Sequence, residues 1–346
     1  MIHESFNLFF ATGSKQYLEF LLTMNAKHIL ISYAYSEPWI MKGMMKRNNI
    51  NLLCDSGAFT AWNLCQRKKM AGDPNWEKHK IVKEEYLDFM NEHKDIIWEA
   101  VNLDVIPGSQ GCAPSQEEVV KAANEGWENY QWFKSKGWDT IHVYHEGEPI
   151  WVLDRMLKEC RYIGVSPCND SHEDKKMDWL DLAFRYIINF DYKDNPTVAP
   201  GHIIKTHGFG VTAKNLVHRY PWFSCDSSSY SLTAAMGSVL TPWGRVYISD
   251  QNLDDPDHLK NKPQEIQDHI EKYLYEQIGY GLKSMIDNKN IIDNACPGCG
   301  SVIQTSEKNQ AYKTRNFANI AYYMNLEKEI QEKGPTLDFM KQTTLF

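Results

Sequence analysis

The segment NLLCDSGAF (residues 51–59) joins an apolar strand pattern to the start of a helix, and this arrangement recurs along the chain. Apolar residues run into an aspartate, and a Ser-Gly turn then leads into a longer amphipathic stretch. Further strand patterns lie at residues 28–32, 98–104, 140–145, 162–166, 202–206, 222–226 and 245–249. Eight strands alternating with helices predict a parallel α/β fold.

The spacing of these elements favours a closed barrel over an open doubly wound sheet. Helical patterns occupy residues 115–136, 149–158, 174–189 and 212–219, and Ser115 with Glu118 forms a capping box at the first of them. No Gly-rich dinucleotide-binding turn follows the first strand pattern, and residues 240–257 resemble a hairpin insertion. We therefore predict a (β/α)8 TIM-like barrel over residues 1–261.

The character of the chain changes after residue 261. Helical patterns at residues 264–283 and 309–332 flank a polar knuckle that holds Cys296 and Cys299. Gly334 and Pro335 then stop the second helix. We predict a small helical appendix over residues 262–333 and a flexible tail over residues 334–346.

Composition excludes several classes of protein. The 346 residues are 42% hydrophobic and 24% charged, which argues against disorder. No apolar run reaches the ~20 residues that cross a bilayer, and the first residues lack a signal-peptide pattern. Eight scattered cysteines indicate reduced thiols, so we expect a cytoplasmic protein, in the host cytoplasm if a phage encodes it.

The net charge of −8 counts mildly against binding nucleic acid by bulk charge. A local basic strip remains compatible with that charge, although such a run taken alone is more often a solvated face. The strip consists of Lys42, Lys46, Arg47, Arg67, Lys68 and Lys69, with Trp62 and Trp76 between them.

Polar residues end most of the strand patterns. Since the carboxyl ends of barrel strands meet at one face, we expect these side chains to gather there. They are Asp55, Asp104, His145, Ser166, His207 and Asp226. Capping of the following turn explains any single aspartate equally well. Three aspartates, each followed by turn residues, predict a site.

Three carboxylates around one pocket suit cleavage at an anomeric carbon. One carboxylate can attack C1′ of a sugar, and a second can move the proton of the leaving group. The third can accept hydrogen bonds from the N–H groups of a guanine-like base edge. Mutual repulsion would separate their pKa values and so assign acid and base roles.

The ordered series DSGAF, DVIPG, IGVSP, HGFG and CDSSS resembles the tRNA-guanine transglycosylase superfamily, and most closely its phage and bacterial DNA 7-deazaguanine transglycosylases. The resemblance covers residues 51–250. It implies a covalent nucleophile at Asp226 and a general acid/base at Asp55. It assigns substrate contacts to Asp104, Gly57, Phe59, Gly164, His207, Gly208 and Gly210.

The resemblance implies a pentosyltransferase that exchanges guanine in DNA for a 7-deazaguanine. Its partners would be DNA, with the guanine flipped out, and the free 7-deazaguanine base. The chemistry requires no cofactor, and no membrane is involved. The terminal QTTLF resembles short peptides that dock on replication sliding clamps, through Gln342, Leu345 and Phe346; a frayed terminus is the alternative.

The chain departs from the family pattern at two places. The family's Gln-containing block is replaced by VYHEGEP, which puts His145 and Glu146 near the base. Of the family's three cysteine and one histidine zinc ligands, only Cys296 and Cys299 are present, and Ala318 stands at the histidine position. A structural zinc site and a metal-free knuckle both remain open.

Three alternatives to this function stay open. The first is the same base exchange on tRNA, and the second is a non-catalytic barrel that binds guanine-containing nucleic acid. The third is an unrelated nucleoside hydrolase. The reduced zinc block and the clamp-like tail favour DNA as the substrate. A binding module would need neither Asp55 nor Asp226, which favours an enzyme.

Overall fold

The computed structural model describes residues 5–109, 112–168, 172–250, 252–286 and 307–341. The chain divides into two compact units. The first comprises Met1–Lys15, Lys27–Ser227 and Glu329–Phe346, and the second comprises Gln16–Ala26 and Ser228–Lys328. None of the helices in the described ranges is both long and apolar enough to span a membrane.

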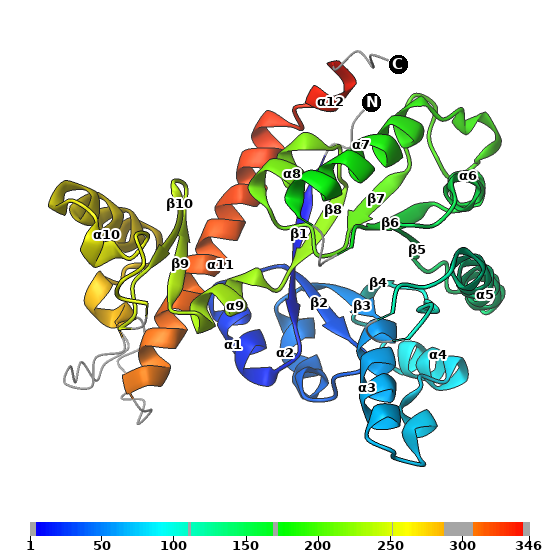
Figure 1. Ribbon diagram of the computed structural model, residues 1–346, viewed down its shortest axis with the longest axis horizontal. Helices are drawn as coiled ribbons and strands as arrows, with labels where there is room; N and C mark the ends of the chain where they lie inside the picture. Colours follow the sequence, from blue (N-terminus) through cyan, green and yellow to red (C-terminus); the bar gives the residue numbers. More distant parts are fainter. Residues whose placement is uncertain (1–4, 110–111, 169–171, 251, 287–306, 342–346) are drawn as a thin grey trace. The chain divides into compact units, whose positions relative to one another are not determined.

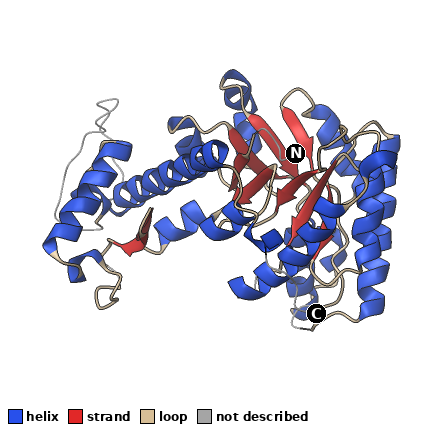
Figure 2. Cartoon of the chain, turned by 90° about the horizontal axis from the view of Figure 1, so that it is seen from above, coloured by secondary structure: helices blue, strands red, loops and turns tan. Residues whose placement is uncertain are grey.

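The first unit is built on one parallel sheet of eight strands, in the order β4-β3-β2-β1-β8-β7-β6-β5. Figures 1 and 2 show this sheet curled, with helices on its outside. The strands are β1 (Asn7–Thr12), β2 (His28–Ser32), β3 (Asn51–Asp55), β4 (Ile97–Ala100), β5 (His142–His145), β6 (Tyr162–Ser166), β7 (Lys205–Gly208) and β8 (Ser224–Ser227).

The helices between these strands are α2 (Lys42–Arg47), α3 (Ala58–Met70), α4 (Lys83–Glu92), α5 (Gln116–Ser135), α6 (Ile150–Glu159), α7 (Glu173–Asn189) and α8 (Lys214–Arg219). Helix α5 begins with the predicted capping box, because Ser115 Oγ accepts from Glu118 N and Glu118 Oε2 accepts from Ser115 N. Alternating strands and helices around a curled parallel sheet make this an α/β fold of the (β/α)8 barrel type.

The outer strands β4 and β5 meet through a short parallel bridge between Val101 and Ile141. Asn102 N donates to Ile141 O at 2.9 Å, and Ile141 N donates to Ala100 O at 2.8 Å. Every second side chain along a strand points into the interior, as a barrel requires. This core consists of Phe9, Leu30, Leu53, Val101, Ile141, Val143, Tyr162 and Phe223.

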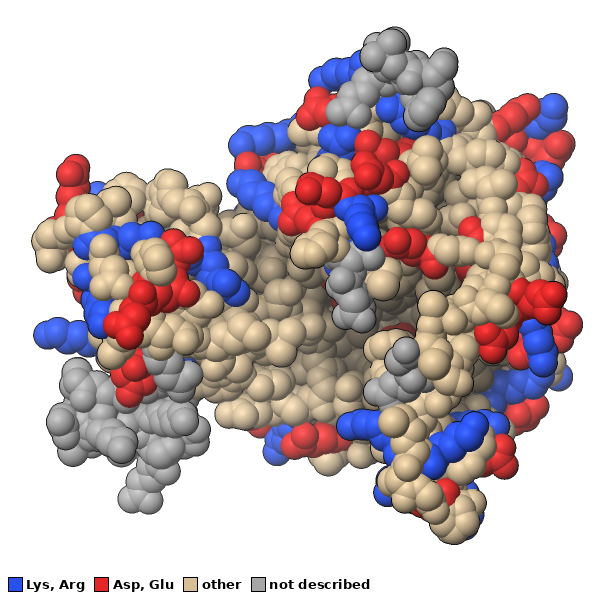
Figure 3. Space-filling model, in the orientation of Figure 1, with Lys and Arg blue, Asp and Glu red and all other residues tan. Residues whose placement is uncertain are grey.

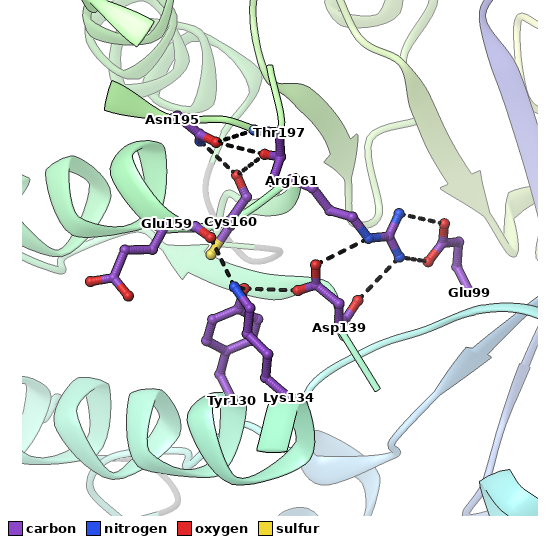
Figure 4. A network of polar contacts seen from close by, with 9 residues as sticks. All are labelled: Glu99, Tyr130, Lys134, Asp139, Glu159, Cys160, Arg161, Asn195 and Thr197. Carbon is purple, nitrogen blue, oxygen red and sulfur yellow. Dashed lines mark hydrogen bonds and ion pairs between the residues drawn. The ribbon is translucent and has the colours of Figure 1, made fainter. Parts of the chain in front are cut away.

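A polar network supports this short β4–β5 junction (Figure 4). Arg161, just before β6, forms a two-pronged ion pair with Glu99 of β4. Its Nε also lies 3.3 Å from Asp139 Oδ2, and the other oxygen of Asp139 accepts from the Tyr130 hydroxyl of α5 at 2.8 Å. Because Asp139 and Arg161 precede their strands, the network lies toward the amino ends of the strands, where barrels are built for stability.

The second unit contains most of α1 (Lys15–Thr23), α9 (Ser229–Ala235), α10 (Gln264–Ile278) and most of α11 (Glu307–Lys333). The antiparallel hairpin of β9 (Ser238–Thr241) and β10 (Gly244–Tyr247) confirms the predicted insertion. The core of the second unit includes Val239, Val246, Ile248, Leu259, Ile270, Leu274, Met285 and Ala318. Ala318, the position at which the resemblance predicts a zinc-binding histidine, is therefore an apolar core residue.

Several of the predicted barrel strands need correction. Residues 245–249 were expected to be the eighth barrel strand, but they overlap β10 of the hairpin. The missing barrel strand is β1, which pairs with both β2 and β8. Strands β5, β7 and β8 begin two to three residues later than predicted, and β4 spans Ile97–Ala100 rather than residues 98–104. Strands β2, β3 and β6 have the predicted boundaries.

The prediction of a free tail from residue 334 onward is wrong for part of that segment. Thr336 N donates to His218 O at 2.8 Å, and α12 (Asp338–Lys341) follows. Phe339 has no exposed surface and packs against Phe184 and Tyr220. The clamp-like residues 342–346 and the two knuckle cysteines lie outside the described residues. The predicted boundaries at residues 261 and 333 stay predictions.

Candidate active site

Side chains two residues apart on a strand point to the same face of the sheet. A strand-end residue therefore faces the barrel interior when the residue two positions earlier does. Leu53 is part of the interior cluster, so Asp55, two residues later on β3, points to the same side. Val143 and His145 have the same relation on β5. This two-residue spacing explains why Asp55 and His145 face the barrel interior.

Asp55 is held by two donors and surrounded by other carboxylates. Gly57 N donates to its Oδ2 at 3.0 Å, and Ser32 of β2 donates a side-chain hydrogen bond. Burial, with smaller contributions from the charges of Asp104 and Asp226, raises the pKa of Asp55 to about 6, although the two hydrogen bonds lower it. The three aspartates are therefore close enough to interact electrostatically. A carboxyl with a pKa near 6 can both give and take a proton near neutral pH.

His145 forms an ion pair with Asp104 beside this carboxylate. His145 Nε2 lies 3.2 Å from Asp104 Oδ2. Burial opposes the charged imidazole, but the hydrogen bond and charge of Asp104, with a contribution from Glu148, raise the pKa of His145 to about 9. His145 is thus a cation at neutral pH, and the described residues supply no partner for its Nδ1–H.

Asp226 begins a buried chain of hydrogen-bonding side chains. His207 has no exposed surface, and its Nε2 lies 3.3 Å from Asp226 Oδ1. Its Nδ1 lies 2.5 Å from Ser224 Oγ, which in turn hydrogen-bonds the hydroxyl of Tyr162. Because a carboxylate oxygen only accepts, His207 Nε2 carries the proton of the hydrogen bond to Asp226.

The same Asp226 oxygen accepts a second hydrogen bond, from Gly210 N at 2.9 Å. Gly210 has a φ of 64°, a left-handed conformation that glycine adopts at low cost. Oδ1 is therefore fixed by two donors, and the described residues supply no partner for Oδ2. This geometry holds one carboxylate oxygen of Asp226 in place and leaves the other without a protein donor among the described residues.

The remaining predicted substrate residues occupy different surroundings. Gly57 is the N-cap of α3 with a φ of 78°, and a Cβ there would lie 2.6 Å from Ser32 Oγ. A Cβ on Gly164 would lie 2.5 Å from the ring of Phe209, so this position also requires glycine. Phe59 is 59% exposed.

Three predicted substrate residues are engaged with the protein itself. Glu146 Oε2 accepts from Cys168 N at 2.7 Å, which ties the loop after β5 to the loop after β6. Gly208 packs tightly, because a Cβ there would lie 2.9 Å from Cys225 Sγ. His207 is buried behind Asp226, and its two ring nitrogens contact Ser224 and Asp226 rather than solvent.

Sequence reasoning missed three members of the site: Ser32, Ser224 and Tyr162. Ser32 ends its strand as Asp55 does, so the strand-end signal was present for it. Ser224 and Tyr162 lie deeper, and their contact joins residues 62 positions apart. Only the pairing of strands could reveal that contact.

Within the described ranges, no group of three or more His, Cys, Asp or Glu side chains is arranged to hold a metal ion. The knuckle cysteines lie outside those ranges, so the zinc hypothesis stays a prediction. No family model and no curated protein matches the chain.

Proposed function

We propose that the protein is a transglycosylase that exchanges guanine in DNA for a 7-deazaguanine base through a covalent intermediate on Asp226. The observation that carries the proposal is that Asp226 and Asp55, both at the carboxyl ends of the barrel strands, differ in their hydrogen bonding and in their pKa. Asp226 has one oxygen fixed and the other without a partner among the described residues. Asp55 has a pKa raised to about 6.

In the first step, Asp226 Oδ2 attacks C1′ of the flipped nucleotide. The C1′–N9 bond breaks, its electron pair stays on N9, and protonated Asp55 supplies the proton that completes free guanine. Two carboxyl groups with separate acid and nucleophile roles are the usual equipment for cleavage at an anomeric carbon. The hydrogen bonds from His207 and Gly210 to Oδ1 orient the attacking group.

In the second step, a 7-deazaguanine enters the same pocket. Asp55, now ionised, takes the proton from its N9, and N9 attacks C1′ and displaces Asp226. The second step therefore returns Asp55 to its protonated form and releases Asp226 as a free carboxylate. A pKa near the working pH suits a group that must act first as acid and then as base.

Asp104 and His145 supply complementary groups for the base itself. The carboxylate of Asp104 can only accept hydrogen bonds, as the N1–H and exocyclic amine of guanine require. Protonated His145 can donate to an oxygen such as O6 of guanine. This acceptor–donor pair matches the edge of guanine and would repel the reversed pattern of adenine.

The proposal is tested by incubating the protein with radiolabelled guanine and duplex DNA, single-stranded DNA or tRNA. Label should enter DNA with the wild-type protein, and Asp226→Ala should abolish the incorporation. Asp88→Ala, which removes an exposed aspartate of α4, is the matched control and should keep full activity. Label entering only tRNA would select the tRNA alternative. Label entering no nucleic acid would reject base exchange.

A further inference from the structure

The solvent-facing side of α3 carries exposed apolar groups between two cations. At 100° per residue, Phe59, Trp62 and Met70 lie on one face of the helix, and Arg67 and Lys69 flank it on either side. The opposite face is buried through Ala61 and Cys65. We refer to Phe59, Trp62, Arg67, Lys69 and Met70 together as the α3 face.

The α3 face is unusually open for apolar side chains. Phe59 is 59% exposed and Met70 is 76% exposed. The rings of Phe59 and Trp62 stack with centroids 6.0 Å apart and planes inclined by 17°. Scattered exposed apolar residues need no explanation, but a stacked aromatic pair in line with an exposed methionine marks an interaction surface.

The charge of this region is opposite to that of the chain as a whole. Residues 58–83 contain six basic and two acidic residues, although the net charge of the chain is −8. Figure 3 shows Lys and Arg side chains gathered where Figure 1 places α3 and the turn after it. Lys69 and Lys80 both lie over the ring of Trp76, at 5.3 and 4.9 Å from its centroid.

Three other basic residues of the predicted strip are already neutralised. Lys42 and Lys46 both form ion pairs with Asp95, at 3.0 and 2.9 Å. Lys68 lies 3.6 Å from Asp73. By contrast, Arg67 has no ion pair with any described residue. Arg67, on the α3 face, is therefore available to an outside anion, and Lys69 lies over the Trp76 ring rather than against a carboxylate.

The position of the α3 face connects it to the candidate active site. Helix α3 begins directly after Gly57, whose N–H holds the Asp55 carboxylate. Phe59 is therefore in the first turn beyond the site. The eleven helical steps from Phe59 to Met70 rise ~16 Å along the axis.

We propose that the α3 face binds unpaired nucleotides next to the flipped target base, with bases on Phe59 and Trp62 and phosphates on Arg67 and Lys69. Stacked aromatic rings bordered by cations are the elements that proteins use to hold single strands. The proposal rests on the proposed function for the identity of the strand as DNA. The stacking and phosphate contacts apply equally to single-stranded RNA, and the experiment separates the two.

The experiment measures binding without chemistry. Fluorescence anisotropy is recorded with labelled 15-nucleotide single-stranded DNA and with RNA of the same sequence, in the absence of free base. Arg67→Gln/Lys69→Gln should weaken binding and reduce the slope of log Kd against log salt by about 1.4, since each single-strand phosphate contact contributes ~0.7. Phe59→Ala should weaken binding at least ~5-fold.

Lys42→Gln/Lys46→Gln removes the same charge from a neutralised part of the surface and is the matched control. It should leave Kd and salt slope near wild type. An oligonucleotide with abasic sites throughout should bind weakly, and Phe59→Ala should have no further effect on it. Unchanged thermal melting of the variants excludes loss of folding as the cause.

Three results would overturn the proposal: no binding of either strand, equal effects of the two double variants, or equal binding of the abasic oligonucleotide. Tighter binding of RNA than DNA would assign the face to RNA and count against DNA as its occupant. Failure of base exchange with intact binding effects would reject the proposed function and leave the α3 face as a nucleic-acid site.

Discussion

Replacing Asp104 by asparagine should lower the pKa of His145, so that its imidazole no longer stays protonated through neutral pH. The pKa of His145 is raised from its ordinary 6.5 to about 9, which is a ~300-fold increase in proton affinity. Burial acts against the charged ring, and the hydrogen bond and charge of Asp104 overcome it. Without that carboxylate, burial prevails, and the pKa of His145 should fall to 6.5 or below.

The assay is a pH titration of the imidazole Cε1 resonances by NMR, with His145→Gln to assign the signal. The wild-type signal should titrate near pH 9 and the Asp104→Asn signal at 6.5 or below. Asp88→Asn is the control and should leave the midpoint near 9.

The same change has a stability signature. A histidine with a raised folded-state pKa stabilises the fold fully below pH 6.5, and this stabilisation is lost as the pH rises through about 9. The wild-type free energy of unfolding should therefore fall between pH 6.5 and 9, and Asp104→Asn should abolish that fall. A wild-type His145 that titrates near 6.5, or a midpoint unmoved by Asp104→Asn, would refute the reasoning.

Three further predictions concern separate features. Gly164→Ala should lower the free energy of unfolding by ~1–3 kcal/mol in urea titrations, because the new Cβ would overlap the Phe209 ring; an unchanged value would contradict the close packing. Glu99→Gln should cost about 2 kcal/mol by removing a charged partner of Arg161, and base exchange should persist because the pair lies away from the carboxyl ends. In single-turnover assays, guanine release should slow as the pH rises above about 6, where Asp55 loses its proton; a rate that increases there would oppose its role as acid.

The strands that the sequence predicted best are those closed by clear turn residues. Strand β3 ends at Asp55 with Ser56 and Gly57 following, so both boundaries were readable. Strand β1 was missed although NLFFAT is a short apolar run, a pattern that is consistent with a buried strand. An antiparallel hairpin strand was counted instead, since local pattern does not reveal which partner a strand pairs with.

The sequence predicted the site residues at the ends of the strands, but it did not predict the buried contacts behind them. Strand-end position marked Asp55 and Asp226, because the carboxyl ends of parallel strands share one face. The contacts behind Asp226 depend on the register of β6, β7 and β8, which places His207 opposite Ser224. The docking of Phe339 likewise depends on long-range packing, and a helix-stopping Gly-Pro pair gave no sign of it.

The most direct measurement of the central claim is a search for a DNA adduct on Asp226. The protein is mixed with guanine-containing DNA, denatured within one turnover, and digested for peptide mass spectrometry. We expect a sugar–phosphate mass on the peptide that contains Asp226, and none after Asp226→Ala. An adduct on another residue, or rapid base exchange with no adduct on any peptide, would contradict the account.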